Sequence, residues 1–435
     1  MKQILLITCM LLTFSAYAQT VRKLDNLTMS EIDAVIASKM SQSNLPGVSV
    51  GIIYNGKVVY TKAYGSSAPG VNATVSTKYP IASISKTITG VMAMRMVQNG
   101  DFALDDPIND YVAGYNGVTF RHLLSHQSGI GHYADCGGGY NGAFNAASSI
   151  LTVYSCSKCM SPPGSGTIYT TYGTTLLGAI IDIVGRAKYN RSYIQLYNDW
   201  IKTPGGLNDL TAEHDNLISG IAVGYSTAGA AQTGYWNDIG WKLPAGGFVS
   251  TGHDLAEYGA GLMNHTFISS SNSTLMWQRQ STSGTPVNSC NDALSGNYGL
   301  AFSVGGSATD RRISHNGLNS HGFSSLLYLF PDKNTGIVLL TNRDEKTAAL
   351  SEIRQALENT LLCPANRDFT SIINWTGNWI YEADNIKASN TFSPGVGAIV
   401  FDGAAGVILK PGFHAQSGIV FRAISDGCSG SVNPY

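Results

Sequence analysis

Charged residues are scarce in this chain, and no long run of one sign occurs in it. Only 13% of the 435 residues are charged, and the formal net charge is −1. Proteins that bind nucleic acid or acidic membranes normally carry a basic patch or tail, so neither partner is expected. Beyond the N-terminus the sequence also lacks an uninterrupted apolar run of about 18 residues, which a membrane-spanning helix would need. The hydrophobic content of 43% is enough to bury a full core.

The N-terminus has the order of features that is typical of an export signal. Lys2 supplies a positive charge, residues 4–14 form a short apolar stretch, and Ala16 and Ala18 flank Tyr17 as a small-x-small cleavage site. A buried N-terminal helix is the alternative, but it would not require this order. We therefore expect a signal peptide over residues 1–18 and an exported protein, located in the periplasm, at the cell surface or outside the cell.

Cysteine is also infrequent, and its use agrees with export. Six cysteines follow the predicted signal peptide, and an oxidising compartment makes structural disulfides the default. The Cys156–Cys159 pair has CxxC spacing, but no second CxxC or nearby histidine pair completes a metal site. We expect at least two disulfides, with Cys156 or Cys159 bonded outside the CxxC, and no metal or cofactor. The six residues are Cys136, Cys156, Cys159, Cys290, Cys363 and Cys428.

The periodicity of apolar residues predicts strands first, then a helical and loop-rich middle, then strands and a last helix. Asn55-Gly56 between two β-rich runs indicates a two-residue hairpin, because both positions tolerate positive φ. Segregated strands and helices favour an α+β domain with an antiparallel sheet. The predicted strands are 48–54, 57–63, 323–330 and 336–342, and the predicted helices are 83–99, stopped by Gly100, 176–184, closed by Gly185, and 350–361.

Two further stretches differ in composition from the rest. Residues 143–172 are rich in Ser, Gly, Thr and Tyr, and are expected to form ordered loops pinned by Cys156 or Cys159. After Cys363, short β-like runs and many glycines indicate a small all-β appendage. The predicted organisation is a large α+β domain over residues 19–363, a linker over 364–374 and a β domain over 375–435.

The segment Ser83-Ile84-Ser85-Lys86 at the start of a predicted helix can carry chemistry. Residues three apart on a helix share a face, so the Lys86 amine can reach the Ser83 hydroxyl. A serine hydroxyl is a weak nucleophile until a base takes its proton, and a lysine can do so only when its pKa is lowered. SxxK alone is a weak signal, because both residue types are common in helices.

Other segments in the right order strengthen this interpretation. Together with the SxxK segment they resemble the serine β-lactamase and penicillin-binding-protein family, in the branch that holds class C β-lactamases, D-Ala-D-Ala carboxypeptidases, D-aminopeptidases and esterases. The resemblance runs from about Leu45 to Leu362 and implies a transpeptidase-like fold that catalyses acyl transfer without a metal or cofactor. The matching segments are 45–47, 80–87, 104–107, 122–129, 163–164 with Tyr169, 245–251 with 254–256, and 315–317 with 322–325.

The family's second motif, Tyr-x-Asn, is present here in altered form. Counting back from Leu176-Leu177 places Tyr169 at the tyrosine position and Thr171 at the asparagine position. The resemblance makes Tyr169 the expected proton-handling partner of Ser83, with the nearby Tyr172 as the alternative. Thr171 offers one hydroxyl in place of an amide, which changes how a substrate amide is held.

The third motif also departs from the family pattern. His315 stands where many members have lysine, and a histidine is mostly neutral at pH 7. His315, Asn316 and Gly317 are expected to bind substrate, and the backbone N–H groups of Ser83 and a residue near Leu318 to stabilise the oxyanion. The segment after Gly317 is one residue longer than the family usually has.

Two histidines and a C-terminal segment also show recognisable patterns. His122 and His126 are four apart but lack the glutamate of a zinc-binding HExxH pattern, so we expect structural roles near the floor of the site. Residues 409–423 resemble the coathanger-stack β domain of exported Bacteroidetes proteins, a resemblance that assigns no chemistry.

The expected function is that of an exported serine hydrolase, acting through an acyl-enzyme on a small ester or a D-amino-acid peptide. The alternatives are a β-lactamase, or a non-catalytic protein that binds penicillin or cell-wall peptides. The substrate is a small molecule or peptide, and the sequence does not indicate the oligomeric state.

Overall fold

A computed structural model describes residues 26–132, 143–156, 161–212, 218–232, 240–281 and 297–361, together with the strand backbones between 366 and 424. These residues divide into two compact units, one ending at Glu358 and one holding the C-terminal strands. The predicted signal peptide and five of the six cysteines lie outside the described residues, as does the side chain of Cys156, so the disulfide prediction stays untested.

The larger unit is built on one antiparallel seven-stranded sheet with the order β3-β2-β1-β10-β9-β8-β7. The predicted hairpin joins β1 to β2, with Asn55 at φ 50° and Gly56 at φ 71°, which is the backbone geometry that Asn-Gly favours. The strands are β1 Gly47–Tyr54, β2 Lys57–Ala68, β3 Val71–Asn72, β7 Ser303–Ser307, β8 Asp310–Asn319, β9 Phe323–Phe330 and β10 Thr335–Thr341.

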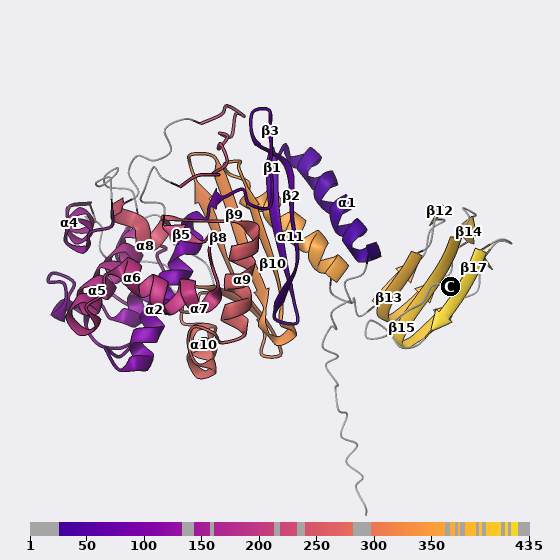
Figure 1. Cartoon of the computed structure of the whole chain (residues 1–435). Helices are drawn as coiled ribbons and strands as arrows, with labels where there is room; N and C mark the ends of the chain where they lie inside the picture. Colours follow the sequence, from indigo (N-terminus) through magenta and orange to yellow (C-terminus); the bar gives the residue numbers. More distant parts are fainter. Residues whose placement is uncertain are drawn as a thin grey trace, which may run out of the picture. The chain divides into compact units, whose positions relative to one another are not determined.

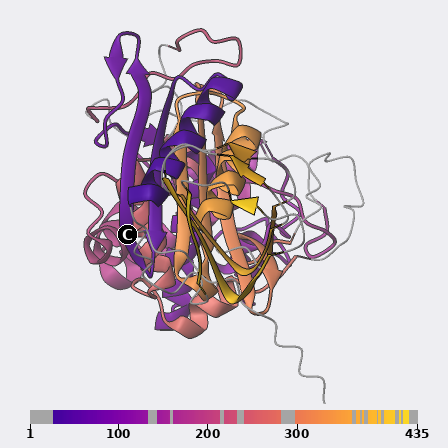
Figure 2. The same cartoon turned by 90° about the vertical axis from the view of Figure 1, so that its right-hand side faces the viewer.

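Helices cover both faces of this sheet. Helix α9 (Gly252–Met263) packs on one face, against β1 and β10. Helices α1 (Asn26–Ser43) and α11 (Thr347–Leu361) lie on the other face, as Figure 1 shows, and both lie in front of the sheet in the view of Figure 2. Every residue of β10 is buried, and the run from Ile337 to Leu340 is apolar without alternation, as expected for a central strand covered on both faces. The α+β prediction is confirmed.

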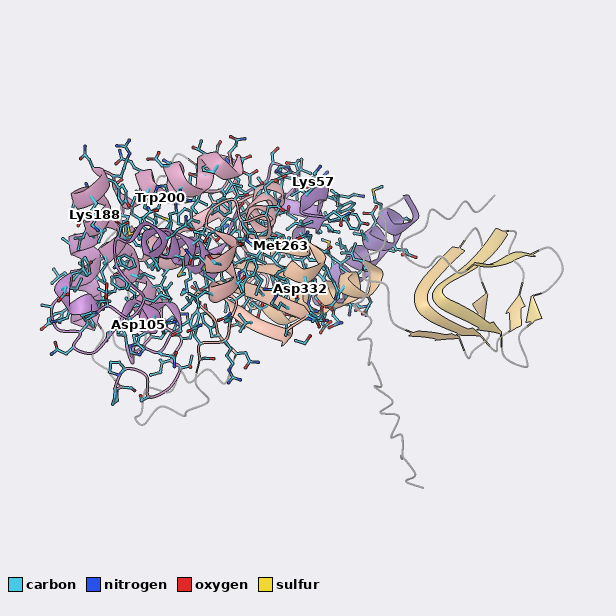
Figure 3. The ribbon with its side chains drawn as sticks, turned by 90° about the horizontal axis from the view of Figure 1, so that it is seen from below. Lys57, Asp105, Lys188, Trp200, Met263 and Asp332 are labelled. Carbon is cyan, nitrogen blue, oxygen red and sulfur yellow. The ribbon has the colours of Figure 1, made fainter. Side chains whose placement is uncertain are left out.

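A helical part adjoins the sheet, and Lys188 and Trp200 mark it in Figure 3. Its longest helices, α2 (Ser85–Asn99) and α5 (Thr171–Tyr189), are buried along most of their length. A small sheet, β4-β6-β5, leads into α2. The other elements are β4 Tyr79–Pro80, β5 Thr211–Ala212, β6 Phe248–Ser250, η1 Ala82–Ile84, η2 Ile108–Asp110, α3 Phe120–Leu124, α4 Ala146–Cys156, α6 Tyr193–Tyr197, η3 Asn198–Lys202, α7 Thr203–Gly205, η4 Gly240–Lys242, α8 Leu243–Gly246, α10 Ser270–Met276 and η5 Pro331–Lys333. None of the described helices combines the length and hydropathy that crossing a bilayer requires.

Two expectations about the helical part were wrong. The stretch 143–172 contains helix α4, whose buried Ala146, Ser149 and Val153 recur at helical spacing. Helix α5 continues past Gly185 to Tyr189 and is capped by Asn190, which adopts the left-handed conformation with φ 52°. Gly185 serves close packing instead, because a Cβ there would lie 2.5 Å from the Leu196 side chain.

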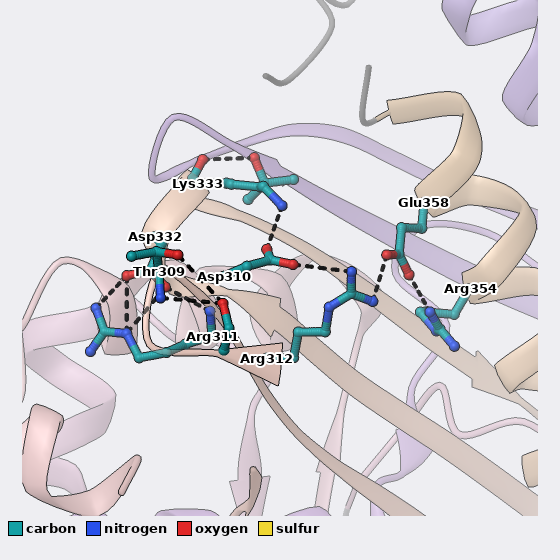
Figure 4. A network of polar contacts seen from close by, with 10 residues as sticks. Thr309, Asp310, Arg311, Arg312, Asp332, Lys333, Arg354 and Glu358 are labelled. Atoms are coloured by element: carbon teal, nitrogen blue, oxygen red, sulfur yellow. Dashed lines mark hydrogen bonds and ion pairs between the residues drawn. The ribbon is translucent and has the colours of Figure 1, made fainter. Parts of the chain in front are cut away.

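Charged residues join β8 to α11 across the edge of the sheet (Figure 4). Glu358, 5% exposed, lies 2.7 Å from an Arg312 nitrogen and also pairs with Arg354. Asp310 on the same strand pairs with Arg312 and, at 2.5 Å, with Lys333. Buried ion pairs of this kind tolerate the loss of one partner poorly.

The C-terminal strands form two parallel sheets, and the chain alternates between them. One sheet has the order β11-β13-β15-β17 and the other β12-β14-β16. Successive strands along the chain thus belong to opposite sheets. Strands β11 and β12 fall within the segment predicted to be a linker. The strands are β11 Asn366–Phe369, β12 Ile373–Asn374, β13 Trp379–Ala388, β14 Thr391–Ser393, β15 Gly397–Leu409, β16 His414–Ala415 and β17 Ile419–Ile424.

Candidate active site

Ser83 lies in the short helix η1, between strand β4 and helix α2. Ala82 before it has φ 47°, in a left-handed region that residues with a Cβ rarely adopt. Strained backbone of this kind clusters at functional sites, where surrounding contacts hold it in place. The turn leaves Ser83 half-buried in the wall of a cavity.

Contacts from two other elements fix this turn. The Ile81 N–H donates to the carbonyl of Phe248 on β6 at 2.9 Å, and the Ser325 hydroxyl on β9 donates to the Ile81 carbonyl, also at 2.9 Å. Gly317 on β8 packs so closely that a Cβ there would lie 2.3 Å from the Ile81 carbonyl oxygen. The absence of a side chain at 317 therefore lets the strand edge approach Ser83.

Lys86 lies one helical turn beyond Ser83, and its amine is sealed inside the protein at 1% exposure. Its Nζ lies 3.1 Å from Ser83 Oγ, 3.2 Å from Thr171 Oγ1 and 2.7 Å from the Ala245 carbonyl oxygen. Burial lowers the pKa of Lys86 well below the usual lysine range, and the charge of Lys242 lowers it further. A neutral amine has two N–H donors and one lone pair, which matches two acceptors and the Ser83 hydroxyl.

The structure brings Tyr169 and Thr171 to this amine. Lys86 Nζ lies 4.9 Å from the centre of the Tyr169 ring, and Tyr169 lines the cavity. Tyr172, the alternative, is buried at 1% exposure with its ring 5.6 Å from that of Trp241. Thr171 stands where the family pattern has asparagine. Its hydroxyl accepts a hydrogen bond from Lys86 Nζ and so helps to position the lysine.

His315 lies on β8 inside the site, and both of its ring nitrogens are hydrogen-bonded. Its Nδ1 donates to the Asn316 carbonyl at 2.7 Å, and its Nε2 lies 3.0 Å from the hydroxyl of Tyr298. Burial lowers the pKa of His315 to about 3, and the charge of Lys86 adds to this effect. His315 is therefore a neutral residue bound to Tyr298, a tyrosine that sequence patterns had not singled out.

Two further imidazoles in the site are buried and neutral, and each accepts a hydrogen bond from the backbone. His126 Nδ1 accepts from the Thr170 N–H at 3.2 Å, and His132 Nδ1 accepts from the Thr171 N–H at 3.0 Å. Burial lowers the pKa of His126 well below its usual value and that of His132 to about 4. These rings hold the first turn of α5, and with it Thr171, against Lys86. The structural role expected for His126 near the floor agrees with this position.

The edge of β8 forms one wall of the cavity. Strand β7 pairs with β8 only as far as Ser314, so the edge from His315 to Asn319 is not covered by β7. Asn316 and Leu318 point to the same side, and Leu318 is 48% exposed. An extended substrate can lie along this edge with its carbonyl at Ser83. Both residues predicted to supply oxyanion N–H groups, Ser83 and Leu318, line the cavity.

The cavity has a volume of about 750 Å³ and contains all the predicted site residues except the buried Lys86 and Gly317. It also contains charged residues that sequence reasoning missed, namely Lys242, Asp344 and Glu345. Lys242 is the one charged residue between Trp241 and Ala245, where the matching segment 245–251 begins. This position is the only feature of the sequence that could have indicated Lys242 as a site residue. Among the described residues no group of three or more His, Cys, Asp or Glu side chains is placed to hold a metal.

Two proteins from other organisms have sequences similar to this chain. "Beta-lactamase-like protein 4" of Dictyostelium discoideum is 28% identical over 298 residues, which cover 63% of this chain. "Protein flp" of Staphylococcus aureus strain MRSA252 is 26% identical over 336 residues, which cover 74% of this chain. The chain spans 52% and 64% of the lengths of these two relatives.

Solved structures with the same fold include a penicillin-binding protein homologue from Pyrococcus abyssi, described as octameric, with a TM-score of 0.63 and 24% identity over 77% of this chain and 79% of that one. Another is the D-amino acid amidase of Ochrobactrum anthropi SV3, with a TM-score of 0.65 and 18% identity over 77% of this chain and 99% of that one. The sequence pattern of the Beta-lactamase family matches residues 32–360. This match covers most of the chain, which therefore belongs to the Beta-lactamase family.

Proposed function

We propose that this protein is an exported serine hydrolase that forms an acyl-enzyme at Ser83. Members of the Beta-lactamase family are generally serine hydrolases. The observation that carries the proposal is the pairing of Ser83 Oγ with the buried Lys86 Nζ at 3.1 Å. A lysine that is uncharged at neutral pH can take the proton of a serine hydroxyl, and burial favours the uncharged form.

The reaction begins with attack of Ser83 Oγ on a substrate carbonyl while its proton passes to Lys86 Nζ. The proton then passes from Lys86 to the leaving group through the hydroxyl of Tyr169, whose ring centre lies 4.9 Å from Lys86 Nζ. Water then attacks the acyl-enzyme, releases the acid and restores the Ser83 hydroxyl. Backbone N–H groups of Ser83 and Leu318 stabilise the negative oxygen of each tetrahedral intermediate.

The substrate that we propose is a small ester or a D-amino-acid peptide or amide. His315 cannot offer the permanent cation that a lysine would present to a lactam carboxylate, because it is buried, neutral and bound to Tyr298. The likeness to a D-amino acid amidase supports testing amides alongside esters. The signal-like N-terminus supports export.

A fluorophosphonate probe and a substrate panel test the proposal. The panel compares p-nitrophenyl butyrate, nitrocefin, a D-Ala-D-Ala peptide and D-phenylalanine amide by kcat/KM. We expect covalent labelling at Ser83, turnover of an ester or a D-amino acid derivative, and little nitrocefin hydrolysis. Ser83→Ala should lower labelling and turnover by at least about a hundredfold.

Ser38→Ala, at an exposed serine of helix α1, is the matched control and should behave as the unmodified protein. Labelling that persists in Ser83→Ala would contradict the assignment of the nucleophile. Nitrocefin hydrolysis far above the ester rate would show that the substrate class is wrong.

A further inference from the structure

Of the described residues that line the cavity, one is a lysine or arginine, namely Lys242, and it lies on η4 rather than on β8. His315, His126 and His132 all surround Lys86 as neutral imidazoles. Lys242 lines the same cavity from η4, half-buried. Its charge acts on both Lys86 and His132.

The segment that carries Lys242 also contacts Lys86 through one of its backbone carbonyl groups. It is the last residue of η4 and directly precedes α8, the short helix whose Ala245 carbonyl accepts a hydrogen bond from Lys86 Nζ at 2.7 Å. Pro244 in the same helix also packs against α5, since a Cβ at Gly178 would lie 2.2 Å from its ring. The segment that carries Lys242 is therefore fixed on both sides.

We propose that Lys242 is a positioning residue whose ammonium group keeps Lys86 in the uncharged form that accepts the proton of Ser83. This inference rests on the proposed function. Within the described part of the chain, the Lys86 amine forms hydrogen bonds with neutral groups, and no carboxylate there forms an ion pair with it. A second ammonium group nearby makes protonation of the first unfavourable. Lys242 on η4 therefore places a positive charge near Lys86, which the neutral His315 on β8 does not.

The groups facing Lys86 that can titrate are Lys242 on η4, His126 and His132 before α5, Tyr169, and His315 on β8. Burial already lowers the pKa of each of these histidines, so they add no positive charge near neutral pH. Within this set, replacing Lys242 removes positive charge without removing a hydrogen bond of Lys86.

The test measures the rate of Ser83 labelling by an uncharged fluorophosphonate between pH 5 and pH 10, in the unmodified protein and in Lys242→Met, Lys242→Gln and Lys242→Arg. We expect the acidic limb of the Met and Gln variants to move to higher pH by about 0.5 to 1 unit, because Lys86 then binds its proton more tightly. On that limb labelling should be about three- to tenfold slower, with the same alkaline plateau. Lys242→Arg should restore the original profile.

Lys57→Met, at an exposed lysine of the β1–β2 hairpin labelled in Figure 3, controls for loss of a positive charge elsewhere. An unmoved profile in folded Met and Gln variants would overturn the inference, as would a change confined to KM for anionic substrates. A displaced profile in Lys242→Arg would also overturn it. If the unmodified protein showed no Ser83-dependent labelling at any pH, the proposed function itself would fail.

Discussion

The histidine side chains around Lys86 are buried, and two of them accept hydrogen bonds that only a neutral imidazole can accept. The Nδ1 atoms of His126 and His132 accept from backbone N–H groups, and a protonated imidazole has no lone pair with which to do so. His315 is 3% exposed. The folded protein therefore resists protonation at these three positions, whereas the unfolded chain does not.

This resistance predicts a dependence of stability on pH. The pKa values of these histidines are lower in the folded state, about 4 for His132 and about 3 for His315, than the value of about 6.5 in an unfolded chain. Their contribution to stability is complete above about pH 6.5 and is lost as pH falls toward the folded-state values, because the unfolded state binds more protons. We expect Tm to decrease from pH 7 to pH 4.5, measured by circular dichroism.

His315→Gln should flatten this dependence, since glutamine does not titrate and can still accept from the Tyr298 hydroxyl. Parallel curves for the His315 variant and the unmodified protein would contradict the prediction.

Sequence reasoning found the site residues that motifs mark and missed those that only packing brings in. Ser83 and Lys86 follow from spacing along a helix, and Tyr169 and Thr171 follow from the resemblance to the family's second motif. Tyr298 could not be found in this way, because it lies outside the named strands and its contact with His315 spans 17 positions. Hydrogen-bond partners across a fold have no fixed offset in sequence, so no local pattern reports them.

Among the elements, the contact of β8 with η1 determines the shape of the site. At Gly317 a Cβ would lie 2.2 Å from Ser325 Oγ and 2.3 Å from the Ile81 carbonyl oxygen. Gly317→Ala should therefore push β8 away from Ser83. Since a displacement of about 1 Å can cost a hundredfold in rate, we expect kcat/KM to fall by about that factor. The measurement is ester hydrolysis, with Tm recorded in parallel.

Gly305→Ala on the neighbouring strand β7 is the matched control, because a Cβ there meets no atom within 4 Å. Its activity should stay within about twofold of the unmodified protein. If Gly317→Ala retained full activity with an unchanged Tm, the close approach of strand and nucleophile turn would not matter for the reaction.

Elements with strong periodicity were predictable from the sequence, and those hidden by composition were not. The β1–β2 hairpin follows from Asn55-Gly56, and α2 ends as predicted at Gly100, whose φ is 75°. Helix α4 was missed because serine and threonine around Val153 obscure its apolar spacing. Helix α5 was cut short because a glycine that serves packing resembles a glycine that ends a helix.

For the molecule as a whole, the division after Glu358 predicts which residues can be removed. A chain that stops after Leu362 keeps Glu358 and the buried Leu361 and should retain kcat/KM within about twofold. A chain that stops after Leu357 loses both and leaves Arg312 without that partner. We expect its Tm to be lower by about 5 °C or more, because removing one member of a buried ion pair is costly.

Thermal unfolding and ester hydrolysis of the two shortened proteins provide the measurement. Folded but inactive protein ending at Leu362 would mean that the C-terminal strands help to form the site. Equal Tm values for the two would show that the Glu358 network contributes little.

The central position of β1 in the sheet has a consequence for the order of folding events. Strand β1 pairs with β10, and the Thr341 hydroxyl donates to the Gly47 carbonyl across 294 positions of the chain. The β1–β2 hairpin therefore leaves the ribosome long before its other neighbour exists, with one edge of β1 unpaired. Contacts this distant in sequence slow folding and leave strand edges open to aggregation in the meantime. The seven-stranded sheet therefore cannot close around β1 until β10 has been synthesised, near the end of the larger unit.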